Sequence, residues 1–432
     1  MLSPLLTQFR ASLTISPSQR PYRRLAARRL PASPWQRSLA AALAVAGTLA
    51  AGGALAGPDD EGLHPFVALG YDHDNNLFRL PDSSPGYDNV RGDSSRRVEA
   101  GLNFNKTYGR EVVTVLAKFD RVSFDHFTQL DYNGKDVRLD LAWHLGNHVN
   151  GTAGMTYLEV LAPYSDYAIR ERNLRVQKHT YAVANWNFHP SWQVRGAAVR
   201  DRYTYDLSSL TYNDRNDDQV ETGLDYLAAS GSTVGVQLRR TKTVYDSLRL
   251  FSGNLVDPGS TQDEVKLRTL WRVTGVTDLQ FLGGYVRRNH VYFTERDASG
   301  VNARLTANTV LTGSVRMNGA LWREFAGSES GVASYTLNRG ASLGASWVAT
   351  AKLLVEAQAR YERRLFDGLL VATLPIEFSD RSHLNSLGLT YAPTSAVQLT
   401  ASAFHEARSG RAIAGNSNYR ASGVSFGVNL HY

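Results

Sequence analysis

The stretch SGVSFGVNLHY, at positions 422–432, decides the fold class. One face of this extended segment carries Val424, Phe426, Val428, Leu430 and Tyr432. The residues between them are small or polar, and this alternation predicts a β-strand with one apolar and one polar face. The stretch has no Lys or Pro of the kind that protects a free sheet edge. We therefore expect the strand to pair along both edges and to close a barrel against the first strand, Leu63 to Tyr71.

Similar segments fill the chain from Leu63 onward. In one of them an apolar face is made by Val137, Leu139, Leu141, Trp143 and Leu145. Its other face carries Arg138, Asp140, Ala142 and His144. A strand with an apolar side toward lipid and a charged side toward a hydrated interior is typical of outer-membrane barrels. The segment 422–432, which alternates and ends on an aromatic residue, also resembles the C-terminal strand of such barrels.

Tight turns are expected near residues 109, 147, 190, 230, 274, 310, 350 and 393, with longer polar loops between them. Two of these loops are expected at Leu207 to Asp218 and Asp246 to Thr261, and the weakest strand pattern is at Val301 to Asn308. The spacing predicts an all-β, antiparallel, up-and-down transmembrane barrel of about 18 strands, with short periplasmic turns and longer extracellular loops. A propeller is disfavoured because each repeat holds two long strands and a blade needs four short ones.

Tryptophan lies close to the expected short turns. This holds for Trp143, Trp186, Trp192, Trp271 and Trp347. Such a distribution predicts an aromatic girdle at one membrane interface, whereas core tryptophans of a soluble β-protein would show no preference for these turns.

The basic character of the chain comes from its first 56 residues. The net charge is +7, but seven arginines and no acidic residue precede Ala56, which leaves 40 basic and 40 acidic residues after it. The net positive charge therefore does not indicate nucleic-acid binding by the rest of the chain. The first 56 residues have the pattern of a cleavable signal peptide: basic residues up to Arg37, then an apolar stretch, then small residues around Ala56. We therefore expect a signal peptide at 1–56 and a single barrel domain at 57–432. There are no cysteines for disulfides.

No motif for catalysis, metal or cofactor binding stands out. The sequence Asp72-His73-Asp74-Asn75-Asn76 begins like a calcium loop, but Leu77 and Ser83 replace the required Gly and Glu. We find no nucleophile elbow or metal-binding histidine pair. We expect no enzymatic activity, no cofactor and no metal.

The charged strand faces are the candidate binding surface. We expect the following residues to face the lumen and to be candidates for solute contact: Arg138, Asp140, Arg195, Glu221, Asp225, Arg239, Glu264, Lys266, Arg268, Arg316, Glu356 and Arg360. Both signs are present, which predicts a hydrated interior without strong anion selectivity. The alternative is that opposite charges pair across neighbouring strands and pack the interior.

Six stretches resemble a known family in the same order along the chain. They are GYDHDNNLFRLP at 70–81, LDYNGKD at 130–136, LGNH at 145–148, RNLR at 172–175, FHPSW at 188–192 and QLRRT at 237–241. Together they resemble the EpsL-type outer-membrane proteins encoded with exopolysaccharide biosynthesis and exosortase systems, although His73 looks like an insertion in the first stretch.

The resemblance implies a barrel in the outer membrane of a Gram-negative bacterium that serves polysaccharide production or export, as a passive conduit or an accessory. It implies as partners the outer-membrane lipid and lipopolysaccharide, the barrel-assembly machinery, exopolysaccharide and other export components. The alternatives are a general diffusion porin for small solutes and a plugged scaffold barrel.

Overall fold

The computed structural model describes residues 61–165, 169–251, 254–292, 294, 297–327, 333–369, 378–411 and 418–431. The expected signal peptide at 1–56 and the terminal Tyr432 lie outside these residues. The barrel consists of β1 (Gly62–Asp74), β2 (Asp93–Tyr108), β3 (Glu111–Phe124), β4 (Tyr132–Leu145), β5 (Val149–Leu161), β6 (Leu174–His189), β7 (Trp192–Tyr205), β8 (Arg215–Leu227), β9 (Thr233–Tyr245), β12 (Ser260–Arg272), β13 (Thr277–His290), β14 (Ala298–Val310), β15 (Val315–Gly327), β16 (Ala333–Thr350), β17 (Leu353–Leu369), β18 (Phe378–Tyr391), β19 (Val397–Gly410) and β20 (Tyr419–His431).

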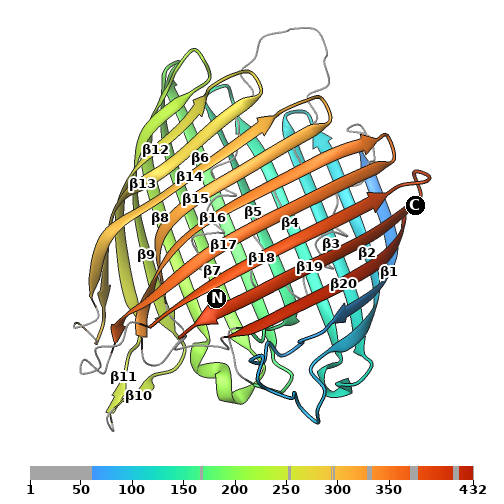
Figure 1. The fold of residues 1–432 in the computed structure, drawn as a ribbon. Coiled ribbons are helices and arrows are strands. Elements are labelled where there is room, and N and C mark those ends of the chain that lie inside the picture. Colours follow the sequence, from blue (N-terminus) through green and yellow to red (C-terminus); the bar gives the residue numbers. More distant parts are fainter. Residues whose placement is uncertain are drawn as a thin grey trace.

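These strands form one closed antiparallel sheet of 18 strands (Figure 1). Each strand pairs with its neighbours in chain order, with β9 pairing to β12, and β20 closes the barrel against β1. The closing register runs from Phe66 opposite His431 to Asp74 opposite Gly423. The predicted barrel, its strand number and its closing pair are therefore confirmed. The weakest predicted strand, at 301–308, is the centre of β14.

Short and long connections alternate, which gives the barrel a turn end and a loop end. The short turns follow β2, β4, β6, β8, β12, β14, β16 and β18, at the predicted positions. The longer connections include 75–92, 125–131 with η3 (Thr128–Leu130), 162–173, 206–214 with η4 (Ser208–Asn213) and 246–259. The loop at 246–259 contains the hairpin β10 (Arg249–Phe251) and β11 (Asn254–Val256), which lies at the bottom of Figure 1.

Two loop boundaries differ from the expectation. β8 already begins at Arg215, so Arg215 to Asp218 belong to a strand. These four residues are polar on both faces, and they therefore lack the hydrophobic alternation that marks the other strands. β12 begins at Ser260, one residue before the expected loop ends at Thr261.

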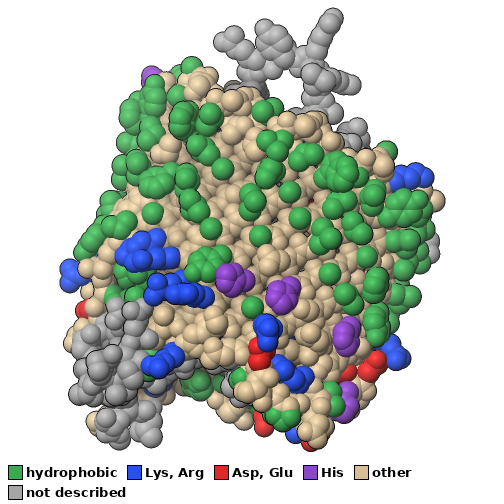
Figure 2. Space-filling model, viewed as in Figure 1, with side chains coloured by type: hydrophobic (Ala, Val, Ile, Leu, Met, Phe, Trp, Pro, Cys, Tyr) green, Lys and Arg blue, Asp and Glu red, His purple; other side chains and the backbone are tan. Residues whose placement is uncertain are grey.

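The outer wall of the barrel is apolar. In β20, Val424, Phe426, Val428 and Leu430 are exposed, as predicted, and apolar side chains are spread over the wall in Figure 2. Charged and histidine side chains gather in the lower part of that view, toward the loop end. Trp186, Trp192, Trp271 and Trp347 are also exposed near the turns, while Trp143 is half-buried. None of the described helices is long or apolar enough to span a bilayer.

Candidate functional site: the barrel interior

All twelve predicted lumen residues lie on the inward face of their strands, because they alternate with outward positions, most of which are apolar. Six of them are almost inaccessible to solvent. These are Arg195, Glu221, Asp225, Arg239, Glu264 and Lys266. Whether any of the twelve touches a solute stays a prediction, but their partners within the chain are defined.

Five of these residues form a continuous ladder of opposite charges across β7, β8, β9 and β12. Glu221 accepts hydrogen bonds from Arg195 at 2.7 Å and from Nε of Arg239 at 2.7 Å. Arg239 also donates to Glu264 at 3.1 Å, and Lys266 pairs with Glu264. Ion pairs in a poorly solvated interior offset the desolvation of their members only when the geometry is good and other polar groups satisfy them. Gln237, Gln219 and Gln262 supply such contacts here.

Four further predicted residues have partners nearby. Arg268 pairs with Asp225 at 2.7 Å, and Arg138 pairs with Asp136. Asp140 accepts a hydrogen bond of 2.6 Å from the hydroxyl of Tyr181. Pairing across neighbouring strands, the alternative to solute contact, is seen for Arg195, Glu221, Arg239 and Glu264. Arg138, Lys266 and Arg360 pair with a carboxylate of their own strand instead.

Arg316 and Glu356 differ from the others. They occupy one row near the turn end, with Ser346 between them on the intervening strand. Among the described residues neither has an ion-pair partner, and both side chains are partly accessible. They are the predicted residues that remain best placed to meet a solute.

A tryptophan site on β14, β15, β16 and β17 was missed. The Trp322 ring lies beneath the guanidinium groups of Arg304 and Arg360, which are 5.2 and 4.4 Å from its centroid, and its Nε1–H donates to Glu362 at 3.0 Å. The ring crosses Gly340 on β16, where a Cβ would come within 2.2 Å of it. A single strand sequence gives no sign of this site, because it depends on the register of four strands.

The calcium-like stretch builds a buried clamp at the loop end. Arg79 is 2% exposed and bonds Asp74 at 2.8 Å and Glu406 at 3.0 Å. Burial lowers the pKa of Arg79, but the two carboxylates raise it by more, so the pKa lies above its usual value. Asp72 faces Arg97 at 3.5 Å. The carboxylates of Asp72 and Asp74 therefore form ion pairs with arginines. Among the described residues there is no cluster of three or more possible metal ligands. His73 stays in register within β1.

Beside the clamp, three loops meet in an apolar cluster that we call the loop-end cluster. Its buried residues are Leu77, Phe78, Val122, Phe124, Phe127, Leu130, Tyr132, Leu161 and Tyr164. Phe78 makes edge contacts with both Phe127 and Tyr164, at centroid distances of 4.8 and 4.7 Å. The cluster ties the connections 75–92, 125–131 and 162–173 to one another.

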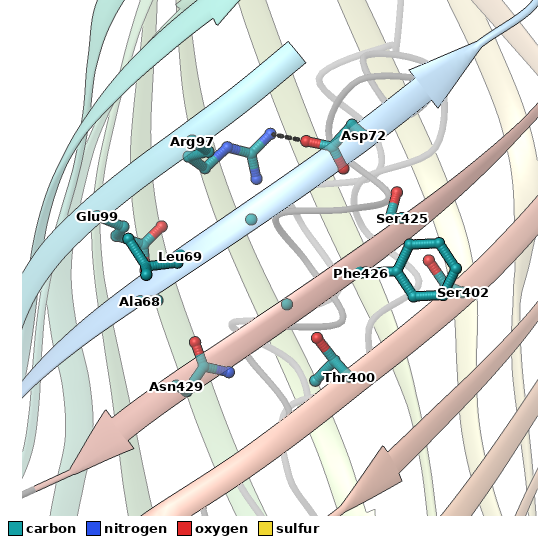
Figure 3. A pocket seen from close by; sticks show the side chains of 12 residues that line it. Ala68, Leu69, Asp72, Arg97, Glu99, Thr400, Ser402, Ser425, Phe426 and Asn429 are labelled. Atoms are coloured by element: carbon teal, nitrogen blue, oxygen red, sulfur yellow. Dashed lines mark ion pairs between the residues drawn. The ribbon is translucent and has the colours of Figure 1, made fainter. Parts of the chain in front are cut away.

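A small pocket of about 30 Å³ lies at the closing seam between β1, β2, β19 and β20 (Figure 3). Thr400, Ser402, Ser425 and Asn429 line it together with the Arg97–Asp72 pair. This volume accommodates about one or two water molecules. A pocket of this volume leaves no room for a sugar.

Searches against protein-family models and against curated proteins found no match. Solved structures with a similar arrangement include the siderophore receptor PirA from Pseudomonas aeruginosa, with 11% identity, a TM-score of 0.42, and coverage of 87% of this chain and 81% of that one. The outer membrane protein opdK from the same organism has 12% identity, a TM-score of 0.44 and coverage of 86% and 99%. The ferric citrate transporter FecA, in its unliganded form, has 14% identity, a TM-score of 0.44 and coverage of 84% and 64%.

Proposed function

We propose that this protein is a Gram-negative outer-membrane barrel that serves exopolysaccharide production or export, as a passive conduit or as an accessory of the export machinery. The membrane part of the proposal is supported by the closed sheet, the apolar outer wall and the exposed tryptophans near the turns. In this arrangement the turn end faces the periplasm and the loop end faces outward. The strand β20, which closes the barrel against β1, is the segment that we propose the barrel-assembly machinery recognises.

The polysaccharide part is supported by where the family-like stretches lie. Two of the six, at 70–81 and 130–136, contribute Leu77, Phe78, Leu130 and Tyr132 to the loop-end cluster, and Leu174 of a third stretch, at 172–175, packs against it. Residues that face lipid resemble one another in many barrels because they share an apolar composition. These five residues pack inside the protein, so a general lipid-facing composition does not account for the resemblance.

The mechanism that we propose is passive. Hydroxyl, amide and charged groups on the inner wall replace part of the hydration of a polar chain. Arg316 and Glu356 are the proposed contacts near the turn end, because the other charges of the predicted set are largely occupied by each other.

A second candidate, a plugged scaffold barrel, is favoured by one observation. The ladder from Arg195 to Lys266 and the loop-end cluster both fill interior space with groups that satisfy one another. A general diffusion porin for small solutes would need a passage past both features.

Deleting the coding sequence in the source bacterium and measuring secreted polysaccharide tests the proposal directly. Secretion should fall and be restored by the wild-type chain; unchanged secretion would refute the polysaccharide role. Conductance in planar bilayers, with and without oligosaccharide, then separates the mechanisms. Conductance that oligosaccharide blocks supports a conduit, unblocked conductance supports a porin, and no conductance supports a plugged scaffold.

A further inference from the structure

Three connections at the loop end meet ring to ring. Phe78 belongs to the connection 75–92, Phe127 to 125–131 and Tyr164 to 162–173, and the Phe78 ring contacts both of the others. All three side chains are buried. We call the segments 76–80, 126–131 and 161–165 the mouth shelf; the structure describes every residue of these three segments.

The mouth shelf packs on the inner face of β3 and β4. Val122 and Phe124 of β3 and Tyr132 of β4 are buried in the same cluster as Phe78. On β3 they lie on the face opposite to Phe119, which is 56% exposed on the outer wall. Tyr132 is directly opposite Val122 in the sheet. The cluster therefore lies on the lumen side of the wall.

The mouth shelf also reaches the inner face of β19. Glu406 and Arg408 are buried there and alternate with the exposed His405. Glu406 accepts the hydrogen bond from Arg79 at 3.0 Å, and Arg408 donates to the carbonyl oxygen of Ser165 at 2.7 Å. Two of the three segments are thus held against β19 by buried guanidinium groups.

These contacts span an arc of the barrel wall. The strands β20, β1, β2 and β3 lie between β19 and β4 in the closed sheet. Because the mouth shelf touches the inner faces of both β19 and β4, it crosses the interior over this arc. Leu77, Phe127 and Leu130 are at most 3% exposed, and close-packed side chains leave no void that a solute could use. This part of the outer mouth is therefore closed.

Buried polar anchors fix the mouth shelf to the strands. Besides the Arg79 clamp, Asp93 at the start of β2 accepts hydrogen bonds from the backbone N–H groups of His126 and Phe127, at 3.0 and 2.8 Å. The side chain of Asn76 donates to the carbonyl oxygen of Arg420 at 2.9 Å. Satisfied polar contacts in a buried setting hold a single arrangement. The mouth shelf should therefore keep its place when a solute reaches it.

We propose that the mouth shelf is a fixed constriction that limits the size of the solutes that cross the outer end of the barrel. A solute has to pass beside the shelf, so a narrow molecule crosses where a wider one is excluded. This inference rests on the conduit or porin form of the proposed function, and it does not depend on which solute is carried.

The test measures the single-channel conductance of the full-length protein in planar bilayers and the largest polyethylene glycol that enters the pore. Phe78→Ala/Tyr164→Ala removes the ring contacts and leaves the Arg79 clamp in place. Conductance should rise at least twofold, and larger polyethylene glycols should enter. The matched control is Trp192→Ala/Tyr226→Ala, which removes a ring pair at 5.3 Å on the outer wall and should leave both readings unchanged.

A second variant loosens the mouth shelf through another contact. Asp93→Ala removes the acceptor that holds the segment 126–131, and it should raise conductance in the same direction. It carries the test if the first variant does not fold, which heat-modifiable migration on gels shows. Unchanged conductance in folded shelf variants, zero conductance throughout, or an equal rise in the control would overturn the proposal. If conductance changes as expected while deletion leaves secretion intact, the polysaccharide role fails and the constriction stands.

Discussion

The guanidinium of Arg79 joins Asp74 to Glu406, at 2.8 and 3.0 Å, and so ties the first long loop to β19 at the opposite end of the chain. Glu406 also accepts a hydrogen bond of 2.5 Å from Tyr419 on β20. The strands β1, β19 and β20 therefore meet at one buried cation beside the closing seam. Nothing in the local sequence marks Glu406 as the partner, because 327 residues separate it from Arg79.

Replacing Arg79 should destabilise the barrel strongly. Arg79→Ala leaves two buried carboxylates without their cation, and breaking such a pair costs about 3–5 kcal/mol. We expect a loss of this size in the free energy of unfolding, measured by urea titration in lipid vesicles. Limited proteolysis should also cut the connection 75–92 faster than in wild type.

The matched control is Arg420→Ala. Arg420 bonds Asp82 of the same loop at 2.7 Å, but its side chain is 70% exposed. An exposed pair contributes about 0–1 kcal/mol, so this variant should remain close to wild type. If both variants lost the same stability, burial would not explain the strength of the Arg79 clamp.

The charge ladder predicts that removing an inward carboxylate destabilises the barrel more than removing an outward one. Glu221→Gln removes the negative charge that Arg195 and Arg239 share and replaces one of its two acceptor oxygens with an amide NH2. We expect a loss of about 3 kcal/mol in the same titration. Asp218→Asn, at an outward position three residues earlier on β8, breaks only the exposed pair with Arg200 and should cost about 1 kcal/mol or less. Similar losses in both variants would indicate that the ladder is well hydrated.

The Trp322 site should not tolerate a side chain at position 340. In Gly340→Ala the new Cβ would lie 2.2 Å from the ring and 2.6 Å from the carbonyl oxygen of Tyr361. Overpacking of this kind costs about 1–3 kcal/mol, and a displaced ring would shift tryptophan fluorescence to longer wavelength. Gly319→Ala is the control, since its Cβ meets nothing closer than 3.6 Å. A Trp322→Leu background should remove the part of the Gly340→Ala cost that comes from the ring and leave the part that comes from the carbonyl oxygen of Tyr361.

The barrel architecture could be predicted from the sequence because each strand carries its own alternation of apolar and polar residues. Lipid on one side and polar groups on the other impose the alternation that is visible in Val137 to Leu145 and in β20. The start of β8 at Arg215 was missed for the same reason, since both of its faces are polar there. Turn positions followed from the short gaps between alternating segments.

The interior and the outer rim could be predicted only in part. The inward orientation of Arg239 or Glu264 follows from one strand, but their partners depend on register. The same holds on the outer wall, where Arg323, Arg339, Arg363 and Arg381 lie opposite one another across β15, β16, β17 and β18. They become one surface only when four strands are aligned, and a shift of one residue between strands would send neighbours to opposite faces. Sequence periodicity alone does not give that alignment.

Barrel closure predicts how the chain responds to charge on its last strand. Phe426 lies opposite Tyr71 near the middle of β20, and its side chain is 56% exposed on the lipid side. Phe426→Arg should destabilise the barrel by about 2–4 kcal/mol, because a cation at mid-depth is poorly solvated by lipid. Leu430→Arg, near the turn end, should cost about 0–1 kcal/mol because the side chain can reach the interface. Urea titration in vesicles and the yield of heat-modifiable barrel in the outer membrane measure both effects. Equal costs at the two positions would mean that β20 does not cross the bilayer as the closing strand.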